Sequence, residues 1–283
     1  MPYMREITCS KITQAVKELC IEANTVLGGD MLKALEDALD QEKSPLAREV
    51  LQRIIQNAGA AKCEKMPMCQ DTGFVVIFAE IGQEVRITEG LFSDAVQEGV
   101  RQGYKEGYFR KSIVKDPFRR ENTGDNTPAV LHSEMVRGNE IRLIVMPKGG
   151  GSENMSEARV FAPSVGIEGV KNYAVEVVKR AGANPCPPVL VGIGLGGTLD
   201  QCTLLSKKAL LRRIGSRHPD PFYAGLEDEI LDSLNRLDIG PAGFGGRTTA
   251  LDVFIEFFPC HIASLPVAVA IQCHAARHAE KRI

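Results

Sequence analysis

The sequence predicts a mixed α/β fold in which a helical N-terminal segment precedes a mixed β-sheet flanked by helices. Apolar residues recur at three- and four-residue steps from about residue 6 to residue 58, which is the period of amphipathic helices. Beyond residue 61, short apolar runs alternate with further helical stretches. No internal repeat is present. We therefore expect one domain over residues 1–283, with a helical segment at 1–60 and an α/β part at 61–283.

The predicted elements follow one another with recognisable start signals. Three helices are expected before residue 60, with starts at Asp30 and at Ser44-Pro45. A helix over 90–108 carries three glycines on one face, which predicts close approach of another backbone. The other expected elements are strand 74–79, strands 129–136 and 140–146 joined as a hairpin, helix 166–180, strand 189–193, helices 199–212 and 221–237, and strands 250–258 and 265–271.

Composition excludes several classes of partner. Apolar residues make up 44% and charged residues 25%, as in ordinary soluble proteins. The net charge of −2 leaves no electrostatic footprint for nucleic acid or an anionic membrane. No apolar run approaches the ~18 residues of a membrane span, and the N-terminus lacks the apolar core of a signal peptide. We expect a cytoplasmic protein without nucleic-acid or membrane partners.

Eight cysteines in such a chain are expected to be thiols or metal ligands rather than disulfides. Because no Cys-x-x-Cys occurs, a metal site would have to be assembled from distant loops. Cys69 opens a polar run, Gln70-Asp71-Thr72-Gly73, directly before a strand. Alone, such a run is more often a turn with an Asx-type cap than a functional site.

Two further cysteines lie in loops beside strands. Cys186 is fixed between prolines before one strand, and Cys273 follows another. A core position and a ligand role are both open for Cys186. Three thiolates from separate loops suit a [4Fe–4S] cluster with one iron left without a protein thiolate.

Two further segments, one polar and one rich in glycine, are also candidate functional segments. The loop over 109–128 is long, which is typical either of functional loops or of a solvated basic loop. Gly149 to Gly151 end a strand and either admit an anion to backbone amides or form a flexible turn.

Residues 192–197 match G-x-G-x-x-G, but the expected acidic residue about 20 positions on is missing, because 210–214 reads as basic helix. We reject a dinucleotide site there and retain an anion cradle at a helix start.

Together these motifs resemble the class I (iron–sulfur) fumarate hydratases, in particular the alpha subunit of the two-subunit form. The resemblance covers nearly the whole chain. It is carried by Cys-Gln-Asp-Thr-Gly at 69–73, Asn-Thr-Gly at 122–124, Lys-Gly-Gly-Gly-Ser at 148–152, Cys-Pro-Pro at 186–188 and the segment around Cys273. L-tartrate dehydratase alpha chains are similar at Cys-Pro-Pro-Val-Leu-Val-Gly and Gly-Ser-Arg-His-Pro.

The resemblance implies a [4Fe–4S] cluster held by Cys69, Cys186 and Cys273, whose open iron acts as a Lewis acid on the substrate hydroxyl. It implies interconversion of fumarate and (S)-malate. Arg110 and Gln70, with the amides of Gly149, Gly150 and Gly151, would bind the dicarboxylate, and Asp71 and His261 would be catalytic.

The histidines are ambiguous on sequence alone. A lone histidine such as His261 more often makes a structural hydrogen bond, and only the resemblance favours an active-site role. Ser264 stands where the family usually has a glycine, so this segment departs from the pattern. His218 is a weaker candidate, and a solvated surface position is expected for His274 and His278.

The resemblance also implies a partner. Single-chain members carry a second domain after the region that this chain matches, so we expect a separate beta subunit to complete the site, in a heteromer such as α2β2. Alternatives are an L-tartrate dehydratase alpha subunit, and a non-catalytic Fe–S sensor or regulatory module. A nucleotide-binding protein built on 192–197 would be a third class.

Overall fold

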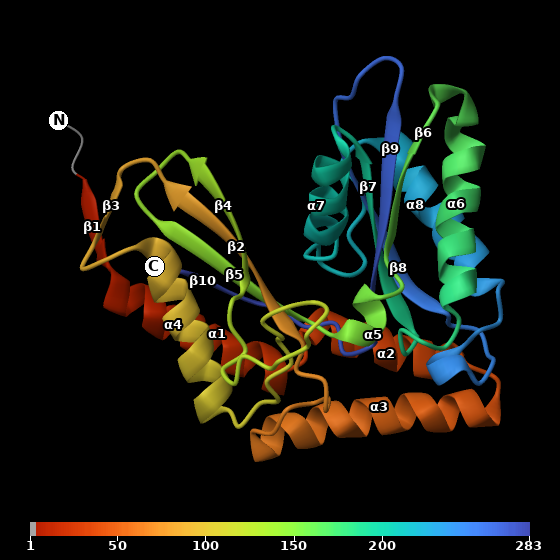
Figure 1. The fold of residues 1–283 in the computed structure, drawn as a ribbon. Coiled ribbons are helices and arrows are strands. Elements are labelled where there is room, and N and C mark those ends of the chain that lie inside the picture. The colour runs from red at the N-terminus through yellow and green to blue at the C-terminus, as the bar shows by residue number, and fades with distance from the viewer. Residues whose placement is uncertain (1–3) are drawn as a thin grey trace. The chain divides into compact units, whose positions relative to one another are not determined.

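The computed structural model describes residues 4–283 and confirms the mixed α/β class (Figure 1). It divides into two compact units. Unit 1 consists of residues 4–27, 58–150 and 277–283, and unit 2 of residues 28–57 and 151–276. The chain passes between these two units, each of which has its own hydrophobic core. The single domain expected from sequence stays a prediction.

Unit 1 is built on a four-stranded sheet of order β10-β5-β2-β4, beside a two-stranded parallel sheet of β1 and β3. Helices α1 and α4 join this sheet in one core. The elements are β1 (Arg5–Thr8), α1 (Cys9–Thr25), β2 (Phe74–Gly82), β3 (Val85–Thr88), α4 (Phe92–Glu106), β4 (Val130–Val136), β5 (Ile141–Lys148) and β10 (Ala279–Arg282). Sequence patterns do not predict β1, β3 or β10.

The expected close approach at the glycines of α4 is confirmed for two of them. A Cβ on Gly99 would lie 2.6 Å from the Cβ of Val16, and one on Gly103 would lie 2.8 Å from the Cβ of Cys20. The backbone of α4 thus packs directly on α1. Gly107 is instead the C-cap of α4, where a Cβ would meet the ring of Phe109.

The predicted hairpin of β4 and β5 is wrong. Both strands form, but β2 lies between them, parallel to β4 and antiparallel to β5. The four-residue connection 137–140 crosses the end of β2, where the Gln83 amide donates to Val136 O and the Gly82 amide donates to Glu140 O. These bonds let a hairpin-length turn join strands that are not neighbours.

Unit 2 contains a second four-stranded sheet, of order β6-β9-β7-β8, with α7 on one face and α6 and α8 on the other (Figure 1). Its elements are α2 (Gly29–Gln41), β6 (Glu157–Phe161), α6 (Gly166–Ala181), β7 (Val189–Gly196), α7 (Leu199–Ala209), α8 (Pro221–Asn235), β8 (Ala250–Phe258) and β9 (Leu265–Gln272), with single 3-10 turns at 163–165 and 241–243. Helix α3 (Pro45–Glu64) and the short α5 (Gly150–Glu153) cross the unit boundaries. Strand β6 is absent from the prediction.

The glycine motif at 192–197 belongs largely to β7. Val191 and Ile193 point into the core with α6 and α8, while Gly192 and Gly194 face α7. A Cβ on Gly194 would lie 1.9 Å from Cys202 O, and one on Gly192 would lie 2.1 Å from Ser206 O. These two glycines therefore let a helix backbone lie on a strand.

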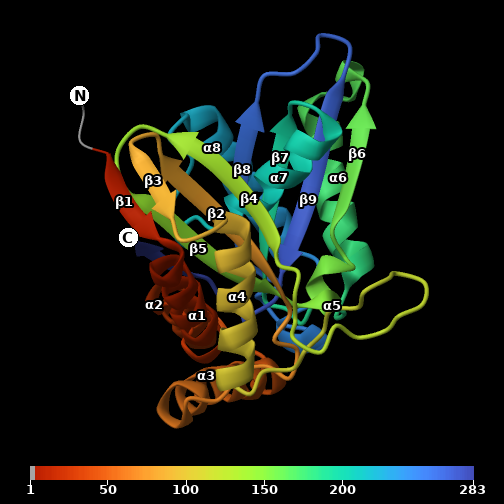
Figure 2. The same ribbon diagram turned by 60° about the vertical axis from the view of Figure 1, so that its left-hand side comes forward.

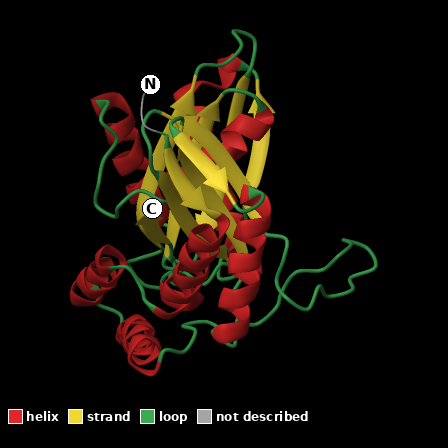
Figure 3. Cartoon of the chain, turned by 90° about the vertical axis from the view of Figure 1, so that its left-hand side faces the viewer, coloured by secondary structure: helices red, strands yellow, loops and turns green. Residues whose placement is uncertain are grey.

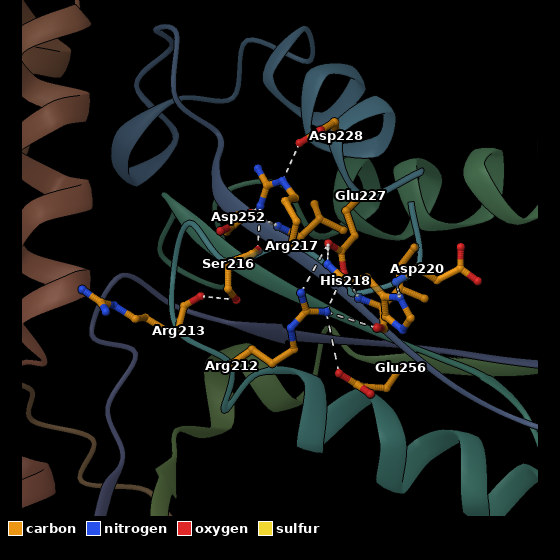
Figure 4. Close-up of polar contacts among 12 residues, drawn as sticks. Arg212, Arg213, Ser216, Arg217, His218, Asp220, Glu227, Asp228, Asp252 and Glu256 are labelled. Atoms are coloured by element: carbon orange, nitrogen blue, oxygen red, sulfur yellow. Dashed lines mark hydrogen bonds and ion pairs between the residues drawn. The ribbon is translucent and has the colours of Figure 1, made fainter. Parts of the chain in front are cut away.

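A polar network fastens the segment after α7 to β8 (Figure 4). Glu227 is fully buried and accepts hydrogen bonds from Arg212 Nη1 at 2.6 Å, from the Ile255 amide at 2.8 Å and from the His218 amide at 3.0 Å. The buried Asp252 accepts from Arg217 Nη1 at 2.8 Å. Because buried carboxylates need such partners, this network holds residues 212–218 in place.

Substituting Gly194 by alanine tests the packing role. We expect Gly194→Ala to lower the free energy of unfolding by about 2–4 kcal/mol, because the methyl group would overlap the backbone of α7. Gly225→Ala is a matched control, since that position lies within α8 and has no atom within 4 Å of an added Cβ. There alanine should raise stability by roughly 0.5–1 kcal/mol. Urea unfolding of both variants measures this, and equal effects would contradict the packing role.

Candidate active site

The turn that carries Cys69 lies in unit 1, between α3 and β2, with Cys69 half-buried. Thr72, at 1% exposure, fixes its end: the Thr72 hydroxyl donates to Arg110 O at 2.9 Å, and the Thr72 carbonyl accepts from the buried Tyr104 hydroxyl at 2.6 Å. The Met68 amide donates to Asn24 O. The turn is therefore held from α1, from α4 and from the loop that follows α4.

Asp71 ties this turn to the glycine segment after β5. Its carboxylate accepts hydrogen bonds from the Gly73 amide at 2.9 Å and from the Gly150 amide at 2.8 Å. A Cβ on Gly149 would lie 3.1 Å from Asp71 Oδ2. The Gly150 amide, expected to face a substrate, is thus already bound to a carboxylate of the protein. Arg277 Nη2 donates to Asp71 O at 2.6 Å.

The polar groups expected to bind substrate flank this turn. Gln70 and Arg110 are both exposed, and the backbone of Arg110 is held by Thr72. The fully buried Asn126 donates from Nδ2 to Gly73 O at 3.2 Å, and its Oδ1 accepts from the Ser112 amide at 2.6 Å. Both ends of the loop after α4 are therefore attached to the segment that follows Cys69.

Unit 2 brings the other two expected ligand cysteines to one end of its sheet. In the antiparallel pairing of β7 and β9, Leu190 lies opposite Gln272, so the turns before β7 and after β9 are neighbours. The Cys186 carbonyl accepts from the His274 amide at 3.2 Å and lies 2.9 Å from His274 Nδ1. Cys186 is exposed and has a φ of 55°, and Cys273 is half-buried.

The glycine segment also reaches this end of unit 2. A Cβ on Gly151 would lie 3.3 Å from Asn184 O, in the turn that leads to Cys186. Ser152 Oγ lies 3.1 Å from Gln272 Oε1, one residue before Cys273. Gly151 therefore serves as close packing beside the Cys186 turn.

His261 does not join the two cysteines of unit 2. It lies in the exposed turn between β8 and β9, where its Nδ1 accepts from the Ala263 amide at 3.1 Å. Cys273 follows the opposite end of β9, and eight strand residues separate the two ends by roughly 25 Å at the usual rise per residue. His261 therefore makes a local hydrogen bond within its turn. This is the structural role that the sequence left open for it beside an active-site role.

The remaining cysteines differ from these three. Cys9, Cys20 and Cys202 are buried in helices, and burial raises the pKa of each thiol, which disfavours the thiolate that a metal needs. Cys63 and Cys260 are exposed. No disulfide forms within residues 4–283. Over the same described range, no three His, Cys, Asp or Glu side chains stand together as a ready-made metal site.

Sequence reasoning missed two residues near these turns. His274, expected on the solvated surface, is half-buried against Cys186 O. Arg277, expected in a basic tail, is 4% exposed, donates to Asp71 O, and has no partner for its Nε among the described residues. The tail is structured because Ala279–Arg282 form β10, a strand that the sequence pattern does not predict. His218 is packed against Tyr223 and Phe257, with its Nδ1 accepting from the Asp220 amide.

Comparison with known proteins defines the class. A family model described as fumarate hydratase (Fumerase) matches residues 13–282. The chain belongs to this hydro-lyase family. No helix in residues 4–283 is long and apolar enough to cross a membrane.

Two relatives show how far the similarity extends. The "Putative L(+)-tartrate dehydratase subunit alpha" of Methanocaldococcus jannaschii is 45% identical over 279 residues, covering 96% of this chain and 98% of that protein. The L(+)-tartrate dehydratase subunit alpha of Escherichia coli K12 is 32% identical over 272 residues, covering 95% and 89%.

Removing the hydroxyl of Tyr104 tests how firmly the Cys69 turn is held. We expect Tyr104→Phe to cost about 1–2 kcal/mol of unfolding free energy, because the Thr72 carbonyl loses its buried donor. Amide exchange at Gly73 should quicken. Tyr108→Phe is the control, because Tyr108 is 91% exposed and its hydroxyl is in water. Urea unfolding and hydrogen exchange measure both effects, and an unchanged Gly73 exchange rate would show that the turn is held by its other bonds.

Proposed function

We propose that this chain is the alpha subunit of an iron–sulfur hydro-lyase that interconverts fumarate and (S)-malate and works with a beta subunit. The observation that carries the proposal is the contact between the Cys186 and Cys273 turns, in a chain that matches the fumarate hydratase family over residues 13–282. The names of both relatives contain "subunit alpha", which supports a two-chain enzyme.

The cysteines that would hold a [4Fe–4S] cluster are Cys69, Cys186 and Cys273. Their chemistry fits, because each is a partly accessible thiol in a turn beside a strand, whereas Cys9, Cys20 and Cys202 are buried in helices. When bound, such a cluster supplies a Lewis-acidic iron that stabilises the departing or entering hydroxide. Substrate choice and proton movement must come from protein groups.

Arg110 would bind one substrate carboxylate. Its guanidinium is exposed while its backbone is fixed by Thr72, so a charged fork is presented beside the Cys69 turn. Gln70, also exposed, offers an amide donor and acceptor at the same turn. These two side chains would orient the dicarboxylate.

Asp71 acts as a positioning residue in this proposal. Its carboxylate holds the amides of Gly73 and Gly150, which joins the Cys69 turn to the glycine segment. Arg277 supports the same turn through Asp71 O. With Asp71 in this role, no candidate residue of this chain is left to move the proton on the carbon next to the substrate carboxylate. We assign this proton transfer to the beta subunit.

The second candidate is L-tartrate dehydration, which the names of the relatives favour. Tartrate carries one hydroxyl more than malate. A site that hydrogen-bonds this extra group rejects a substrate without it by about 10⁴-fold or more, so the two activities should separate clearly.

Initial rates decide the substrate. We expect the alpha and beta chains, reconstituted together anaerobically with iron and sulfide, to turn over (S)-malate and fumarate faster than L-tartrate, and the alpha chain alone to be inactive. A preference for L-tartrate would move the proposal to its second candidate. Full activity without a beta chain would contradict the two-chain form. A cluster without turnover of either substrate would favour a sensor module.

Cysteine replacement tests the ligands. We expect Cys69→Ser, Cys186→Ser and Cys273→Ser each to remove or strongly reduce the broad visible absorbance of the anaerobic protein, because serine is a poorer ligand for iron–sulfur clusters. Cys63→Ser and Cys260→Ser are matched controls, since both thiols are exposed and outside the proposed ligand set. Loss of absorbance in a control, or its retention in a ligand variant, would reassign the ligands.

A further inference from the structure

The loop between α4 and β4 contains an ordered arm, which we define as residues 113–123. Val114 and Asn122 form an antiparallel bridge. The Lys115 amide donates to Glu121 O at 2.7 Å, and the Thr123 amide donates to Ile113 O at 2.9 Å. The arm extends beyond the sheet and helices of its own unit as a narrow loop (Figures 2 and 3). It is a small hairpin rather than a formless connection.

The tip of the arm has a defined shape. Asp116 Oδ1 accepts from the Phe118 amide at 2.9 Å and from the Arg119 amide at 2.7 Å, and Asp116 O accepts from the Arg120 amide at 3.0 Å. The amides of Arg119 and Phe118 hold the pKa of Asp116 below its usual value. The carboxylate supports the turn above the ordinary pKa of about 3.9, and this support is lost as the pH falls through the lowered value.

This ordered tip presents an aromatic ring to water. Phe118 is 92% exposed, and Pro117, Arg119 and Arg120 around it are exposed too. Aromatic and arginine side chains are enriched in the energetically dominant centres of protein interfaces. An ordered turn that holds an aromatic ring in solvent forgoes the free energy of burying that ring within its own chain. Such an exposed ring is typical of an anchor for another protein.

The root of the arm is attached to the proposed active site. Thr72 Oγ1 donates to Arg110 O before the arm, and Asn126 after the arm donates to Gly73 O. Asp125 accepts from Arg101 Nε at 2.9 Å and from Thr127. Burial opposes the charge on Asp125, but the bonds from Thr127 and Arg101 outweigh it and hold its pKa at about 2. The loop that carries the arm is thereby held at both of its ends by the Cys69 turn.

We propose that residues 113–123 are a docking arm for the beta subunit, which receives Phe118 in an apolar pocket whose acidic rim faces Arg119 and Arg120. The inference rests on the two-chain form of the proposed function. At the tip, Lys115 is paired with Glu121, and Arg119 and Arg120 together outweigh the carboxylate of Asp116, so the partner meets a net positive charge.

Charge disfavours three surface pockets of a second copy of this chain as seats for the tip. Three of the surface pockets on the described residues lie at β6 and α6, on α3, and beside the turn at 137–140. Each has more arginine and lysine than aspartate and glutamate in its lining, with three cations against two carboxylates in the first and third, and two against one in the second. Such pockets would repel Arg119 and Arg120. The partner that also completes the site is the better match.

The test is the affinity of the alpha chain for its cognate beta chain, measured anaerobically on full-length proteins. We expect Phe118→Ala and the double variant R119E/R120E each to raise the Kd about tenfold or more, with Phe118→Leu nearer the unmodified value. Ile262→Ala is the matched control, because Ile262 is also 92% exposed but lies in the β8–β9 turn. Its Kd should stay within roughly twofold. Thermal unfolding of the isolated chains checks that every variant is folded.

The possible outcomes distinguish failure of the docking proposal from failure of the proposed activity. Unchanged binding of both arm variants, or no binding of the beta chain by the unmodified protein, overturns the proposal. Arm variants that lose only self-association of the alpha chain would also overturn it and identify a second copy as occupant. Normal assembly with lost turnover would make the arm part of the active site instead. Arm-dependent assembly of a complex that turns over neither malate nor tartrate would support the arm and refute the proposed activity.

Discussion

The antiparallel register of β7 and β9 determines which polar residues of unit 2 can act together. Pairing Leu190 with Gln272 fixes the turns of Cys186 and Cys273 at one end of the sheet and sends the turn of His261 to the other. A slip of one residue would put Ala268 and Ala270 where Val267, Val269 and Ile271 fill the core, so packing enforces this register. Helix α7 can cover β7 only because glycines face it.

Local patterns in the sequence predict much of this fold. Helices with a clear apolar period and strands with continuous apolar runs form where they are expected, because each buries a face that its own sequence defines. Short or polar strands are missed: β6 is largely exposed, and β10 is a run of charged residues that exists only because β5 offers an edge. The order of strands is also beyond local pattern, as the insertion of β2 between β4 and β5 shows.

The three site thiols stay a prediction from sequence, and the contacts that support their turns are not predictable from it. Cys69, Cys186 and Cys273 stand out in sequence because each adjoins a strand in a polar or proline-rich turn. The residues that hold these turns come from far along the chain, such as Tyr104 and Arg277 for the first. Their roles depend on tertiary contacts. The glycines were ambiguous for a related reason, since an amide that could face an anion can equally be used by an internal carboxylate, as Asp71 uses that of Gly150.

Hydrogen bonds join the Cys69 turn to the loop on both sides of the arm. The bonds from Thr72 to Arg110 O and from Asn126 to Gly73 O mean that the loop root and the turn can hardly move independently. A protein that binds one arrangement of the arm more tightly than others must therefore favour the matching arrangement of the turn. By reciprocity, whatever occupies the turn changes the affinity for that partner to the same degree. Binding of such a partner and ordering of the turn are then one equilibrium.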